Sequence, residues 1–171
     1  VGAFRGNNIA EVTFADGSLL GSIADEAFYG CKNLKSVVIP EGVKSLGKSA
    51  FSNCSALESI TLAESVETLG VNIFGGCHKL ESVTLPNSIT VISRNSFASC
   101  AALTELTIPN KVEEIGLNAF NACGFVNIVL PNSVKTMGNT VFSGCDKLET
   151  ATLSKSMTAL SMDAMLIMVS F

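Results

Sequence analysis

Six cysteines are the residues of this sequence best suited to chemistry, because thiols can form disulfides, bind zinc or act as nucleophiles. They are Cys31, Cys54, Cys77, Cys100, Cys123 and Cys145, and the first four intervals between them are equal whereas the fifth is one position shorter. Such regular spacing indicates one position of a repeated unit, so the thiols form a ladder of similar small apolar groups. A disulfide needs Cβ atoms about 3.8 Å apart, closer than the roughly 4.8 Å between rungs, and zinc ligands usually come in close pairs. We therefore predict six buried free thiols and no metal site.

The other candidates for chemistry are the single histidine and a set of glutamates. His78 follows Cys77 at a variable corner of the repeat, with no nucleophile or orienting acid at a suggestive spacing. The glutamates recur with the repeat and are explained as solvated charges at strand edges: Glu58, Glu81, Glu105 and Glu149. The sequence predicts no catalytic residue and no cofactor, and hence a protein that is not an enzyme.

Composition limits the partners of the chain. A hydrophobic share of 47% with only 15% charged residues argues against disorder. The net charge of −4 argues against nucleic acid and anionic membranes, since both require a basic patch. No apolar run approaches the roughly 18 residues of a spanning helix, so no membrane insertion is expected. Positions 1–4 do not look like a leader peptide, and the start partway through a repeat favours a fragment of a longer protein.

The repeat that spaces the cysteines must position all of these side chains. A phenylalanine stands three residues before each cysteine, at Phe28, Phe51, Phe74, Phe97, Phe120 and Phe142. In the unit from Cys31 to Asn53, Val37 and Ile39 alternate as in a half-buried strand, and Pro40 ends it. Residues 43–46 predict a second short extended segment, and Ala50-Phe51 a single helical or 3₁₀ turn. No long helix is expected.

Stacked units bury apolar surface that one unit cannot, so we predict a leucine-rich-repeat solenoid whose strands form one parallel sheet. Residues 1–171 are interpreted as a single domain: 1–30 a degenerate first repeat, 31–144 five regular repeats, and 145–171 a degenerate last repeat or cap. The fifth repeat lacks one residue after Cys123. The apolar tail at 164–171 either covers the end of the stack or begins a further repeat.

The outward positions of the expected strands are where binding would take place. They form a hydroxyl-rich face, and the residues predicted to contact a ligand are Ser36, Ser59, Thr61, Ser82, Thr84, Glu105, Thr107 and Asn127. β-Branched Thr also suits a solvated strand face without any ligand. The face carries none of the Trp, Tyr and Arg anchors that are common at binding hot spots. Both interpretations therefore stand on the sequence alone.

The unit C-x-x-L-x-x-V/I-x-L/I-P-x-x-V/I-x-x-I/L-x-x-x-A-F resembles the BspA-like subclass of leucine-rich repeats between Cys31 and Phe142. The departures are Ala63 and Ser154 in place of Pro, the deletion near Gly124, and the last repeat. The resemblance implies a cell-surface or secreted bacterial-type protein that binds a protein or glycan, in adhesion or recognition of host components. The alternative is a structural spacer or self-associating scaffold that displays other domains.

Overall fold

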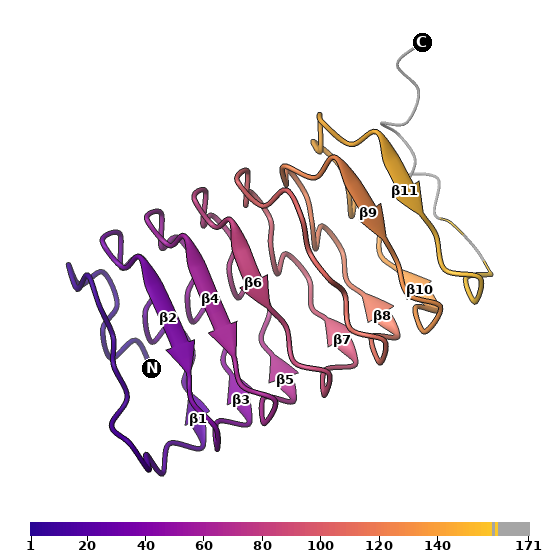
Figure 1. Cartoon of the computed structure of the whole chain (residues 1–171). Helices are drawn as coiled ribbons and strands as arrows, with labels where there is room; N and C mark the ends of the chain where they lie inside the picture. The colour runs from indigo at the N-terminus through magenta and orange to yellow at the C-terminus, as the bar shows by residue number, and fades with distance from the viewer. Residues whose placement is uncertain (159, 161–171) are drawn as a thin grey trace.

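The computed structural model describes residues 1–158 and 160, which coil into stacked turns with one turn for each repeat (Figure 1). Every regular element in this part of the chain is a short strand, and no helix occurs in it. The predicted solenoid of stacked parallel strands is therefore confirmed. The tail at 164–171, for which two roles were considered, lies outside the described residues.

Five strands run along one side of the coil and are called the first strip here: β2 (Ser36–Ile39), β4 (Ser59–Leu62), β6 (Ser82–Thr84), β9 (Asn127–Val129) and β11 (Thr150–Thr152). β2, β4 and β6 pair in parallel, with Ser36 opposite Ser59 and Ser59 opposite Ser82. β9 and β11 pair in the same way. Each pairing joins equivalent repeat positions, so the repeat length fixes the register.

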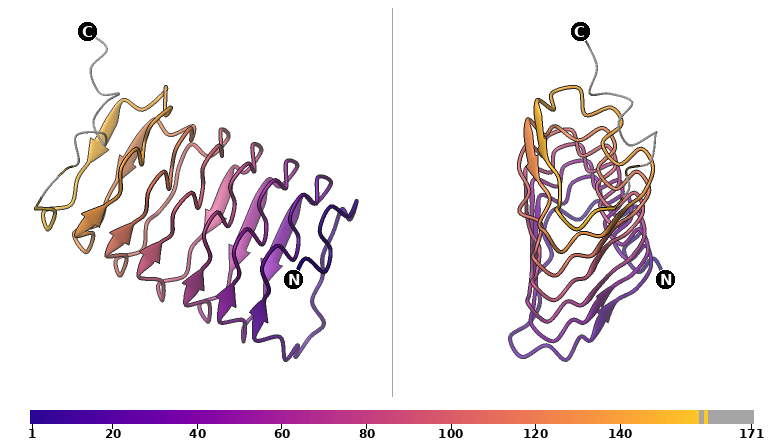
Figure 2. Two further views of the ribbon diagram at one scale, coloured as in Figure 1. Left: turned by 180° about the vertical axis from the view of Figure 1, so that it is seen from behind. Right: turned by 90° about the vertical axis from the view of Figure 1, so that its right-hand side faces the viewer.

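Six two-residue strands form the second strip: β1 (Ser22–Ile23), β3 (Ser45–Leu46), β5 (Thr68–Leu69), β7 (Val91–Ile92), β8 (Glu114–Ile115) and β10 (Thr136–Met137). They pair in parallel in two groups, β1-β3-β5 and β7-β8-β10. The short extended segment predicted at 43–46 is thus a strand over its last two residues. The end-on view in Figure 2 shows the two strips on opposite sides of a flattened coil.

The Ala-Phe segment closes each coil, and here the structure differs from the helical or 3₁₀ turn that the sequence predicts. Successive tight turns replace it, because two residues per coil adopt left-handed backbone angles, such as Ser49 (φ 54°) and Asn53 (φ 58°). The amide of Ser52 bonds back to the Ser49 carbonyl at 3.2 Å, whereas the amide of Phe51 bonds forward to the next coil. Left-handed residues thus turn alternate backbone groups towards the neighbouring coil, which a helix would not permit.

The core is a stack of side-chain columns inside the coil. Phenylalanine rings stack from Phe4 to Phe142, with neighbouring centroids 5.1–6.1 Å apart. Beside this column, Leu34, Leu57, Leu80 and Leu103 are fully buried. The inward residues of β2 and β4 are buried as well, whereas Val83 of β6 is half-buried. Each large side chain contributes about 1.5–3 kcal/mol when buried, and each packs mainly on its counterparts in adjacent coils.

Candidate functional site

The predicted ligand-contact residues lie on one outward face of the first strip. Seven of the eight are exposed and Ser59 is half-buried. Ser36, Ser59, Thr61, Ser82 and Thr84 belong to the paired strands β2, β4 and β6, whereas the remaining three belong to the region between β6 and β11. No observation tests whether these residues bind a ligand, so their role stays a prediction.

The first strip is interrupted between β6 and β9, contrary to the single continuous sheet that the sequence predicts. Elsewhere, the residue before each strand donates its amide to the preceding coil, as Glu81 does to Glu58 at 2.9 Å and Glu149 to Val126 at 2.8 Å. Residues 104–108 occupy the intervening rung, and within the described chain their backbone makes no hydrogen bond to either neighbour. This rung therefore lies between two strands without joining their ladders.

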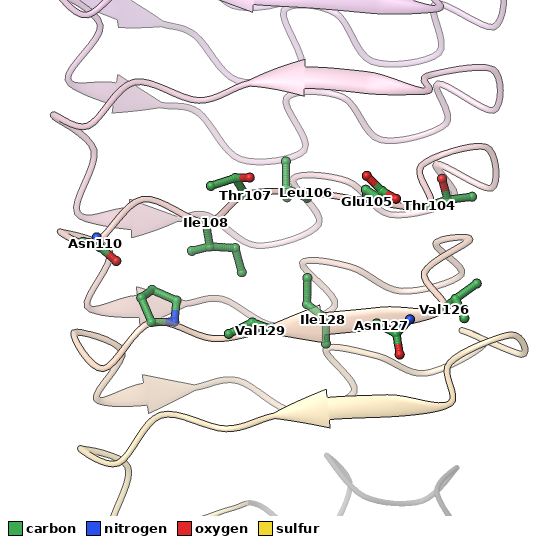
Figure 3. Close-up of a pocket in the computed structure, with 11 residues that line it drawn as sticks. Thr104, Glu105, Leu106, Thr107, Ile108, Asn110, Val126, Asn127, Ile128 and Val129 are labelled. Atoms are coloured by element: carbon green, nitrogen blue, oxygen red, sulfur yellow. The ribbon is translucent and has the colours of Figure 1, made fainter.

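A groove of about 680 Å³ opens beside this unpaired rung (Figure 3). It is lined by Thr104, Glu105, Leu106, Thr107, Ile108, Asn110, Val126, Asn127, Ile128, Val129 and Pro131. Ile108 and Ile128 are buried and form apolar walls, whereas Glu105, Thr107 and Asn127 are exposed. The side chain of Asn127 also accepts a hydrogen bond from Thr150 on β11. The groove combines apolar walls with a polar rim, as ligand sites usually do.

The repeat that borders the groove is one residue short. In the regular repeats two residues separate the cysteine from the buried leucine, whereas only Gly124 separates Cys123 from Phe125. Phe125 is fully buried and takes the place of that leucine. The shortened turn runs so close to the preceding coil that a Cβ on Gly124 would lie 2.3 Å from the Ala101 carbonyl oxygen. A larger ring on a shorter connection thus comes two residues before β9, whose residues line the groove.

A second, smaller groove of about 340 Å³ lies beside the first coil. Its lining includes Glu11, Thr13 and Phe14 on one side and Ser36 and Val38 of β2 on the other. Residues 11–14 also form no strand. Each groove thus lies beside an unpaired rung of its own. Each of these two rungs carries a glutamate, Glu105 or Glu11, at the position occupied by Ser in β2, β4 and β6.

All six cysteines are buried and free, as the sequence predicts. Each thiol donates a hydrogen bond to the phenylalanine carbonyl of the preceding coil, for example Cys123 Sγ to Phe97 O at 3.1 Å. The spacing of the cysteines did not reveal this bond. Burial raises the pKa of the Cys100 thiol to about 12 and also raises the pKa of Cys123. These two thiols are therefore protonated parts of the core at neutral pH.

The remaining candidates for chemistry are dispersed. His78 is exposed at its corner, where its Nδ1 lies 2.9 Å from the Ser99 carbonyl oxygen. Glu58, Glu81, Glu105 and Glu149 are all exposed, in agreement with the prediction. Among residues 1–158 and 160, no three His, Cys, Asp or Glu side chains come together as metal ligands would. No helix that could cross a bilayer occurs in the same part of the chain.

The groove is a feature of the candidate binding face that sequence reasoning missed. Its only signal was the interval between Cys123 and Cys145, which is one position shorter than every other interval between successive cysteines. That interval identifies a deletion, but it does not predict whether the strands on either side of the deletion pair with each other.

A stack of near-identical coils with one open sheet face defines the class of repeat solenoids, and comparison with known families agrees. The family model described as "BspA type Leucine rich repeat region (6 copies)" matches residues 1–124 and 90–166. The chain belongs to this family of BspA-type leucine-rich-repeat proteins. The resemblance stated from the repeat unit is thereby confirmed.

Solved bacterial structures share the fold. A leucine-rich repeat protein from Bacteroides ovatus is 32% identical, with a TM-score of 0.70 over 72% of this chain and 34% of its own. The leucine-rich repeat protein of T. pallidum is 31% identical, with a TM-score of 0.68 over 76% and 62%. A leucine-rich cell surface protein from Faecalibacterium prausnitzii is 32% identical, with a TM-score of 0.71 over 80% and 37%.

The chain spans less than two thirds of the length of each of these three proteins. A comparison with curated proteins gives no match. The likenesses establish the fold and the family.

Proposed function

We propose that this chain is a non-catalytic recognition module of a cell-surface or secreted protein, which binds a protein or glycan through the first strip. The observation that carries the proposal is the groove along residues 104–108, where apolar walls and a polar rim lie between the paired strands β2-β4-β6 and β9-β11. The exterior location is supported by the likeness to the F. prausnitzii protein, which is described as a cell surface protein. We treat residues 1–171 as one solenoid domain.

The absence of catalysis is part of the same proposal. Cysteine is a nucleophile only as a thiolate, and the buried thiols are held by carbonyl groups, as Cys100 is by Phe74. His78 lies at an exposed corner and contacts the Ser99 carbonyl rather than a nucleophile or a carboxylate. Hydrolytic activity that is lost on the substitution His78→Ala would contradict this part of the proposal.

A structural spacer or self-associating scaffold is the second candidate. It is favoured by the backbone ladder of the closing turns, in which each phenylalanine amide bonds to the next coil, from Phe4 to Ala27 at 2.7 Å through Phe120 to Val141 at 3.1 Å. This ladder continues past the groove, so the coil stays connected where the first strip is open. A spacer would need only this continuity and no ligand.

A binding screen with two matched variants tests the proposal. The purified chain is applied to immobilised matrix proteins, mucins and glycans, alongside Thr107→Arg at the groove and Thr68→Arg as the control. Thr68 lies on the paired strand β5 of the second strip, and both residues are exposed. We expect a retained ligand whose affinity falls about tenfold or more with Thr107→Arg and less than about twofold with Thr68→Arg.

Two outcomes of the screen would count against recognition at the groove. If the two substitutions lower the affinity equally, the ligand does not bind at the groove. An inert wild-type chain that forms end-to-end oligomers in size-exclusion chromatography would favour the scaffold instead.

A further inference from the structure

We propose that the first strip binds a basic protein through two equivalent grooves, each of which takes one Lys or Arg side chain of the partner. This inference rests on the proposed function and names the partner class and the spacing of its two contact points. It follows from a pattern of residues that occurs twice on the strip and from the charge of both grooves.

The repeated pattern is the first step of the argument. Each rung of the first strip has two outward positions, and in most rungs a residue with a hydroxyl group occupies at least one of them. The first outward position is Glu only at Glu11 and Glu105, in the two rungs that border the grooves. The second outward position is Val only at Val38 and Val129, and each Val lies on the rung that directly follows a Glu rung. The two grooves are therefore lined by the same pair of residue types.

This pair of residue types matches a long basic side chain. Val38 and Val129 are 65% and 63% exposed, although the inward apolar residues of β2 and β4 are buried. Glu11 and Glu105 are exposed as well. Lys and Arg lay their methylene groups on apolar surface and keep the charged group outside it. In each groove the methylene groups would pack on the Val, and the charged group would meet the Glu.

Charge complementarity favours a basic partner. Each groove has one charged lining residue, Glu105 in the larger groove and Glu11 in the smaller, and neither groove is lined by Lys or Arg. On the coils between the grooves, Glu58 and Glu81 are exposed on the same face. Such a face repels acidic groups and steers a basic surface towards it.

The second strip provides a contrast within the same stack. There Glu67 pairs with Lys44 at 3.0 Å, and Glu113 pairs with Lys135 at 2.8 Å, in each case between adjacent coils. Within the described chain, the carboxylates of the two grooves take part in no ion pair. A partner that supplies the cations would complete the same kind of pair on the first strip.

The number of coils between the grooves sets the spacing of the two basic side chains. The strands β2, β4 and β6 lie between the rungs 11–14 and 104–108. At roughly 4.8 Å from one rung to the next, the two rungs are about 19 Å apart. The outward side chains of β4 and β6 are Ser and Thr, which are short. A partner surface that lies across these strands can therefore reach both grooves at once.

Two rigid peptides test this spacing with the complete chain. A polyproline helix has three residues per turn and rises about 3.1 Å per residue. Two lysines placed six residues apart in such a peptide point in the same direction about 19 Å apart, whereas two lysines three residues apart are about 9 Å apart. We expect the wider peptide to bind about fivefold or more tightly than the narrower one, because only the wider peptide can occupy both grooves. NMR titration at low salt measures both affinities.

Matched substitutions show whether both grooves contribute. Glu11→Gln and Glu105→Gln should each lower the affinity for the wider peptide about threefold or more, towards that of the narrower peptide. Val38→Thr and Val129→Thr introduce the residue type that β4 and β6 carry at this position, and each should lower the affinity about twofold or more. Glu114→Gln makes the same change of charge at an exposed position of β8 on the second strip, and it should have less than about a 1.5-fold effect.

The outcomes separate this inference from the proposed function. If the two peptides bind equally, or if Glu11→Gln leaves the affinity for the wider peptide unchanged, the grooves do not act as a pair and the inference is wrong. If neither peptide binds while the screen retains a ligand that Thr107→Arg weakens, the recognition site stands and its partner class is corrected. If neither the peptides nor the arrayed ligands bind, the proposed function fails together with the inference.

Discussion

Phe125 packs edge-on against Phe120, with ring centroids 5.5 Å apart and ring planes at 77°, whereas the rings of the phenylalanine column mostly stack. An edge-on ring occupies a different space from the leucine found at this position in neighbouring coils, such as Leu103. Phe125 comes two residues before β9, and the first strip is unpaired between residues 104–108 and β9. We infer that the deletion and the larger ring together keep these rungs apart.

Restoring the regular turn should therefore close the first strip. In a variant with Ser-Ala-Leu, the tripeptide found at 55–57, in place of residues 124–125, we expect the backbone of 104–108 to pair with its neighbours. Hydrogen exchange at the amides of 105–108 should then slow towards the rate at 60–62 in β4, because paired amides exchange only on local opening. Exchange followed by mass spectrometry or NMR measures this change.

A single substitution serves as the control for this prediction. Phe125→Leu reduces the ring without restoring the missing residue, and it should destabilise the core by about 1 kcal/mol or more as a large-to-small change. If neither variant slows exchange at 105–108, the cause of the open strip lies elsewhere than in the shortened turn.

Gly124 should tolerate no side chain. A Cβ at this position would lie 2.3 Å from the Ala101 carbonyl oxygen, so Gly124→Ala forces backbone apart and should destabilise the chain by about 1–3 kcal/mol. At Gly21, by contrast, an added Cβ would have nothing within 4 Å. Gly21→Ala should therefore change stability by less than about 0.5 kcal/mol. Urea unfolding compares both variants with the wild type, and similar losses in the two would refute the close approach.

Much of the fold could be predicted from the spacing of apolar residues. Val37 and Ile39 alternate along the sequence, and both are buried on β2, as period-two patterning requires. The equal spacing of the cysteines placed their side chains at one stacked position, and this position proved to be in the core. Both inferences hold because each coil packs on a near-copy of itself, which makes long-range contacts as regular as local ones.

The closing turns and the groove could not be predicted in the same way. Ser49 and Ala122 adopt left-handed angles (φ 54° at each), although neither residue type favours this conformation. The hydrogen bonds to adjacent coils impose it, and those bonds exist only in the stack. The groove depends on whether two rungs close over Phe125, which is decided by ring size and packing geometry rather than by the apolar pattern.

Native thiols should be almost unreactive. All six are buried, and a raised pKa keeps Cys100 and Cys123 protonated at neutral pH, whereas disulfide reagents react with the thiolate. We expect Ellman's reagent to modify less than about one thiol per native chain in the time that it modifies all six in denaturing urea. Rapid modification of several thiols in the folded chain would show that the reagent reaches these side chains and that they are not buried.

Alkaline pH should destabilise the chain through the same thiols. Burial raises the pKa of Cys100 from its ordinary value of 9.0 to about 12, so above pH 9 the unfolded chain loses this proton while the folded chain keeps it. Stability is therefore fully present below pH 9 and falls as pH rises towards 12, since the folded state binds more protons in this interval. Urea midpoints measured under reducing conditions should fall between pH 8 and pH 10. Cys100→Ala should show a smaller fall than the wild type, and an equal pH dependence in the two chains would mean that this thiol does not contribute to it.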